Sequence, residues 1–159
     1  MFREMRRFKQ LLSTEETVAV LNRGSNGVFA CLGDEDYPYA VPVNYVYYNG
    51  KIYYHSAKAG HKVDAVTKHP KVSFTVVDKD TIVSAEYTSY FRSVIAFGKA
   101  RVVEGPEWRE AFMALVEKYS GDQPEAAKNK EVDACTHALI YAIDIEHLTG
   151  KEARELLKG

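Results

Sequence analysis

Residues 55–62, His-Ser-Ala-Lys-Ala-Gly-His-Lys, combine the side chains that a phosphate-binding loop uses. Ser56 offers a hydroxyl donor, Lys62 a full positive charge, and His61 a donor or a partial charge. Gly60 lets the backbone approach a ligand closely. A helix that begins near Gly60 would add free N–H groups and a dipole that favours an anion. The same pattern is typical of a capped helix with a solvated lysine, and composition alone favours that second interpretation.

A series of short strands and turns must position this loop. The strands are expected at residues 28–32, 39–48, 51–56, 72–77, 92–103 and 138–145, with Asn49-Gly50 as a hairpin turn. The helices are expected at residues 14–23 behind a Ser13–Glu16 capping box, at 60–69, at 106–119 and at 151–157. Six strands with turn-rich connections predict a mainly β fold, an antiparallel barrel with peripheral helices.

Length and composition indicate one ordinary globular domain over residues 1–159, with 46% apolar and 27% charged residues. The net charge of −1 argues against a broad surface for nucleic acid or an anionic membrane. No apolar run approaches the roughly 18 residues of a membrane span, and no apolar region follows the basic N-terminus as in a secretory signal. We therefore expect a cytoplasmic protein.

The other residue patterns in the sequence give little support for a metal site or a catalytic site. Cys135 and His137 form a C-x-H pair without a second ligand pair, and the histidines lack standard ligand spacing, so we expect no metal site. There is neither a G-x-G-x-x-G nor a G-x-S-x-G motif, so the sequence supports neither a Rossmann site nor a hydrolase. Arg92 fits either an approach to a cofactor or substrate anion, or a surface ion pair. The acids Glu35, Asp36, Asp78 and Asp80 are expected to be solvated in loops.

Three further segments accompany His55–Lys62 in a characteristic order: Tyr39–Tyr45, Tyr90–Ala100 and Ile145–Lys151. Together, over roughly residues 5–152, they resemble the FMN-binding split-barrel family related to pyridoxamine 5'-phosphate oxidase. Tyr90–Ala100 is similar to the nitroimidazole-resistance branch, with Phe91 where that branch often has tyrosine. The resemblance implies a six-stranded antiparallel split barrel.

The resemblance also implies roles for individual residues. Ser56, Gly60, His61 and Lys62 would hold the FMN phosphate, and His55 and Ala57 would line the ribityl chain and the ring edge. The isoalloxazine would be bordered by Pro42, Val43 and Asn44, with Ser93 at its heteroatom edge. Position 61 is histidine where relatives often have arginine, which predicts weaker or more pH-dependent FMN binding.

The implied activity is an FMN-dependent oxidoreductase that reduces a small nitro-aromatic such as a 5-nitroimidazole, with His55 as the candidate catalytic residue. Whether the protein is an enzyme stays open, since a non-catalytic flavin binder or sensor and a haem-binding protein use the same fold. The family also implies a homodimer with flavin sites at the interface. A small-molecule substrate is expected, and neither nucleic acid nor membrane is expected as a partner.

Overall fold

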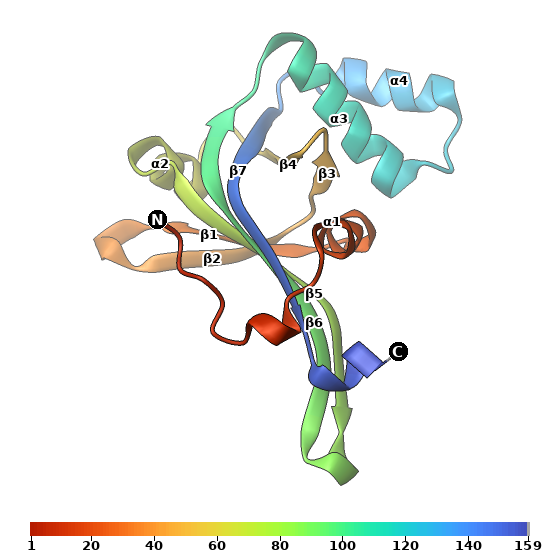
Figure 1. The fold of residues 1–159 in the computed structure, drawn as a ribbon. Coiled ribbons are helices and arrows are strands. Elements are labelled where there is room, and N and C mark those ends of the chain that lie inside the picture. Colours follow the sequence, from red (N-terminus) through yellow and green to blue (C-terminus); the bar gives the residue numbers. More distant parts are fainter. Residues whose placement is uncertain (159) are drawn as a thin grey trace.

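In the computed structural model, which describes residues 1–158, every named strand belongs to one antiparallel sheet (Figure 1). The sheet order is β2-β1-β5-β6-β7-β4-β3. The strands are β1 (Gly27–Leu32), β2 (Pro38–Val43), β3 (Val46–Tyr48), β4 (Lys51–Ser56), β5 (Lys71–Val83), β6 (Thr88–Val102) and β7 (Leu139–Glu152). The mainly β, antiparallel prediction is confirmed.

The sheet has seven strands rather than the six expected, because residues 39–48 form two strands. Asn44 interrupts the pairing: its Nδ2 donates to the carbonyl of Ser25 at 2.8 Å, and Tyr45 turns into the core. The Asn49-Gly50 turn between β3 and β4 is confirmed. Both of its residues have positive φ, as the tightest hairpin turns require.

The helices pack against several strands of the sheet. They are α1 (Thr14–Arg23), α2 (His61–Lys68), α3 (Gly105–Ser120) and α4 (Glu125–Ala134). The first three were predicted, and the capping box of α1 is present; α4 was not predicted. The helix expected at 151–157 is wrong in its first part, because β7 continues to Glu152 and only Arg154–Lys158 form a 3-10 turn. None of the helices in residues 1–158 is long and apolar enough to cross a bilayer.

Two apolar clusters hold the fold together. The larger lies inside the curled sheet, where Val20 and Leu21 of α1 pack against Phe29, Tyr54 and Phe74 from the strands. The smaller lies on the outer side of β3, β4 and β7, where α3 contributes Ala111 and Leu115. Each side chain of this kind contributes roughly 1.5–3 kcal/mol when fully buried. Residues of β4 belong to both clusters, so packing on both faces of the strand fixes its position.

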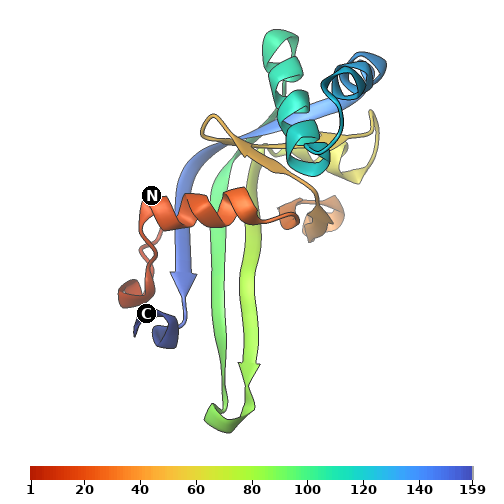
Figure 2. The same cartoon turned by 90° about the vertical axis from the view of Figure 1, so that its right-hand side faces the viewer.

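The hairpin of β5 and β6 extends well beyond the other strands as an arm (Figure 2). At its base the pairing shifts by one residue, and Asp78 is the extra residue. Its carboxylate accepts hydrogen bonds from Arg23 at 2.7 and 2.8 Å and from Arg92 at 3.0 Å; Arg92 also binds Glu152 at 2.8 Å. Asp78 is therefore an ion-pair partner rather than a solvated loop acid, and Arg92 adopts the ion-pair alternative.

Candidate functional site

The loop between β4 and α2 presents an unobstructed helix start. Gly60 is the N-cap of α2, with a φ of +144° that favours glycine, and no side chain caps the helix. A Cβ built on Gly60 would meet nothing within 4 Å, so the space above the first turn is open. The first N–H groups of α2 therefore lack a capping side chain and are available to an anion.

The polar side chains of this loop differ in their availability. The hydroxyl of Ser56 donates to the carbonyl of Ala57 at 2.9 Å, a local contact that a ligand could replace. Lys62 forms no ion pair with any carboxylate of residues 1–158. Burial raises the pKa of the nearby Cys31 thiol, and the positive charge of Lys62 opposes that rise. Within the described part of the chain, Lys62 is therefore a cation without a carboxylate partner at the start of α2.

His61 faces the turn between β1 and β2. Its Nε2 accepts the backbone N–H of Asp34 at 3.1 Å, and its ring packs on Tyr39 with centroids 4.2 Å apart. The same Nε2 lies 3.8 Å from the carboxylate of Asp34. In this arrangement His61 positions the β1–β2 turn against α2, and its contribution to the loop is its backbone N–H.

His55 and Asn44 line one cavity of about 620 Å³ between the outer face of β4 and the α3–α4 pair. His55 is exposed, and its ring has no hydrogen-bond partner among residues 1–158. The apolar wall comes from α3, with Phe112, Leu115 and Val116. Sequence reasoning missed this wall, although the helical spacing of these three residues was visible and only the strand that they cover was unknown.

Pro42 and Ser93 lie on the outer face of the sheet, whereas the side chain of Val43 faces the core. Two rows of outward residues cross five strands on this face. In register they are Pro42-Val28-Thr75-Ile95-Thr149 and Ala40-Ala30-Ser73-Phe97-His147. Neither row contains a carboxylate, a lysine or an arginine. These two rows therefore form an uncharged, partly apolar strip, with Lys71 and Glu146 in the groove beside it.

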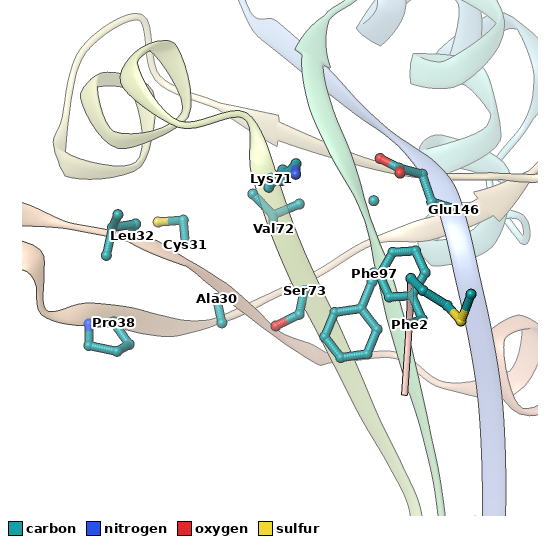
Figure 3. A pocket seen from close by; sticks show the side chains of 12 residues that line it. Phe2, Ala30, Cys31, Leu32, Pro38, Lys71, Val72, Ser73, Phe97 and Glu146 are labelled. Atoms are coloured by element: carbon teal, nitrogen blue, oxygen red, sulfur yellow. The ribbon is translucent and has the colours of Figure 1, made fainter. Parts of the chain in front are cut away.

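A groove of about 600 Å³ runs along this outer face (Figure 3). Phe2 and Phe97 lie toward one end and Pro38 and Leu32 toward the other. Phe2 stacks on His147 with centroids 4.8 Å apart and on Phe97 at 5.5 Å. The N-terminal segment thus covers one end of the face and leaves the rest open.

Lys118 is an unusual group that sequence reasoning also missed. Its Nζ is buried without a hydrogen-bond partner and lies 3.9 Å from the centroid of the Tyr45 ring. Desolvation lowers the pKa of Lys118 from 10.5 to about 8. A cation held only by aromatic faces is stabilised less than one with a carboxylate partner.

We expect Lys118→Met to stabilise the protein at pH 7 by about 1–3 kcal/mol, since each pKa unit corresponds to about 1.36 kcal/mol. The folded pKa is depressed, so between pH 8 and 10.5 the unfolded chain binds the proton that the folded chain has released. The unfolding free energy of the wild type should rise across that window. Urea unfolding of both proteins at pH 7 to 10.5 measures this rise. If the unfolding free energy of Lys118→Met rises by the same amount, Lys118 is not its cause.

Comparisons with known proteins agree with this architecture. The family model "Pyridoxamine 5'-phosphate oxidase" matches residues 13–152. A conserved hypothetical protein of Mycobacterium tuberculosis superposes with a TM-score of 0.81 at 23% identity, covering 96% of this chain and 92% of that one. A candidate 5-nitroimidazole antibiotic resistance protein of Bacteroides thetaiotaomicron gives 0.74 at 21%, covering 89% and 86%. The FAD and heme binding protein of Mycobacterium smegmatis gives 0.73 at 21%, covering 92% and 74%.

Proposed function

Because the chain belongs to the pyridoxamine 5'-phosphate oxidase family of flavin-binding split barrels, we propose that it binds FMN and acts as a cytoplasmic oxidoreductase on a small nitro-aromatic. The observation that carries the proposal is the uncapped start of α2, where Gly60 leaves open space beside the unpaired cation of Lys62. Substrates of the 5-nitroimidazole type are suggested by the similarity to the Bacteroides thetaiotaomicron protein.

The loop residues fit a phosphate in distinct ways. The backbone N–H groups of His61 and Lys62 and the hydroxyl of Ser56 donate hydrogen bonds, and the Lys62 ammonium neutralises charge. The ring of His61 is engaged with Asp34, so its side chain points away from the proposed phosphate. When bound, FMN supplies the electron-transfer chemistry, while the protein holds and orients it. Pro42, Asn44, His55 and Ala57 would border the rest of the cofactor.

His55 is the proposed proton donor to the reduced substrate, because it is the exposed imidazole in the cavity that Asn44 and α3 also line. We expect His55→Gln to retain FMN but to reduce 5-nitroimidazole about 100-fold more slowly with reduced nicotinamide as the donor. Absorbance of the nitro compound and of the bound flavin are the two readouts. If the wild-type protein holds FMN but shows no turnover, it is a non-catalytic flavin binder. If the wild type and His55→Gln react at equal rates, His55 takes no part in the reaction.

A homodimer through the two uncharged rows of the outer face is the second part of the proposal. Val28, Ile95 and Phe97 are 37–39% exposed there, and a partner copy would bury them. Pro42 and Ser93, both expected flavin contacts, lie on the outer face of the sheet. Pro42 is on the edge strand β2, which four strands separate from β4, whereas only β7 lies between β4 and the β6 strand that carries Ser93. Two copies facing each other offer a way to bring such distant contacts to one flavin.

We expect Ile95→Glu to convert the dimer to a monomer and to lower its FMN content, because burying an unpaired carboxylate is costly. Light scattering after size exclusion measures the mass, and absorbance measures the flavin. The matched control is Val102→Glu, an equally exposed position (43%) farther along the same strand and outside the two rows. A dimer that survives Ile95→Glu places the interface elsewhere.

A further inference from the structure

A small cavity with basic walls lies where the N- and C-terminal segments meet. It measures about 300 Å³ and is lined by Arg6, Arg7, Phe8, Lys9, Gln10 and Arg154. In Figures 1 and 2 the short helical turn at residues 8–10 and the C-terminal turn lie close together. In Figure 1 they lie well away from α2, so this cavity is distinct from the proposed FMN phosphate site.

The arginines of this cavity differ from the four that bind carboxylates elsewhere in the chain. Four of the eight arginines bind carboxylates, namely Arg23, Arg92, Arg101 and Arg109. No carboxylate of residues 1–158 lies within ion-pair distance of Arg6, Arg7 or Arg154. On a chain with a net charge of −1, three guanidinium groups around one cavity, none of them paired with a carboxylate of the described residues, form a local excess of positive charge.

The backbone that carries these groups is fixed. Gln10 is 4% exposed, its Nε2 donates to the carbonyl of Glu152 at 3.0 Å, and its N–H donates to the carbonyl of Arg7 at 2.9 Å. The N–H of Leu12 donates to the carbonyl of Gly150 at 2.9 Å, which attaches the segment to the free edge of β7. Arg6, Arg7 and Arg154 are thus held near one another by hydrogen-bonded chain rather than by a mobile end.

We propose that this cavity binds the phosphate groups of a small phosphorylated molecule other than FMN. Guanidinium groups bind phosphate oxygens through paired hydrogen bonds, and several of them around one cavity suit a multiply charged group. The cavity is large enough for a phosphate or pyrophosphate group, and none of its lining residues is acidic. The site goes beyond the proposed function, because the residues assigned to FMN lie elsewhere.

Calorimetric titration of the purified protein with inorganic pyrophosphate, and separately with NADPH, tests the proposal. We expect saturable binding of pyrophosphate that Arg6→Gln/Arg154→Gln weakens about tenfold or more. The control Arg109→Gln removes a paired arginine from α3 and should leave binding unchanged. Thermal unfolding of each variant confirms that it is folded. NADPH binding that is tighter than that of pyrophosphate and lost in the double variant identifies a nucleotide as the source of the phosphate.

Three results overturn the proposal. The first is the absence of binding by either probe to the wild type. The second is equal weakening in Arg109→Gln and in the double variant, which indicates nonspecific attraction. The third is loss of pyrophosphate binding in Lys62→Ala but not in the double variant, which places the anion at the start of α2. Because this last result supports the FMN phosphate site, failure of the inference and failure of the proposed function are distinguishable.

Discussion

Replacing Asp78 with alanine is expected to lower the unfolding free energy by about 3 kcal/mol, because it breaks two ion pairs, with Arg23 and with Arg92, and leaves Arg92 with one carboxylate instead of two. The Asp78 side chain is only 10% exposed and Arg92 is 27% exposed, whereas Arg23 is 51% exposed, so most of the expected loss comes from the contact with Arg92. Urea unfolding at pH 7 measures the loss. Asp133→Ala is the matched control, since its pair with Arg109 is exposed and should contribute no more than about 1 kcal/mol.

The carboxylate of Asp78 should also make the unfolding free energy depend on pH in the acidic range. Its hydrogen bond from Arg23, followed by the one from Arg92, holds the pKa of Asp78 below its ordinary value of 3.8. A depressed carboxyl pKa stabilises the fold above the unfolded value, and this stabilisation is lost as the pH falls through the folded value. The difference between wild type and Asp78→Ala should therefore shrink below about pH 4. A difference that stays constant from pH 7 to pH 3 contradicts the ion-pair assignment.

Replacing Lys62 with alanine is expected to weaken FMN binding about 10- to 100-fold. The substitution removes a charge-assisted phosphate contact of about 1.5–3 kcal/mol and leaves the backbone N–H groups of α2 in place. Quenching of flavin fluorescence during titration of flavin-free protein gives the dissociation constant. Riboflavin, which lacks the phosphate, should bind wild type and variant equally.

Lys68→Ala serves as the control for this variant, because it removes the same charge from the exposed last turn of the same helix. If both variants weaken FMN to the same extent, the effect is a general attraction and Lys62 has no specific contact. If neither does, the phosphate does not bind at the start of α2.

The parts of the fold that local chemistry determines could be predicted from the sequence. Ser13 and Glu16 form the expected capping box, with hydrogen bonds of 3.1 Å in both directions. Asn49 and Gly50 adopt the positive φ values that their turn type needs. The start of α2 also follows from local preference, since Gly60 permits a backbone that other residues avoid.

Features that depend on distant contacts could not be predicted. The arm was missed because residues 78–91 are mostly polar or exposed, and only the partner strand and the Arg92 ion pairs hold them extended. Helix α4 was missed because it has no continuous apolar stripe; it is held by Val132 and by Lys128, which binds Glu117 and Glu125. The orientation of His61 depends on Asp34, 27 residues away.

FMN binding is tested by the visible absorption spectrum of the purified protein, together with mass identification of the cofactor that heat releases. We expect a yellow protein that releases FMN. A red protein with a Soret band and the mass of haem contradicts it and identifies a haem-binding member of the fold. A colourless protein that also fails to take up added FMN contradicts it as well, and leaves the start of α2 without its proposed ligand.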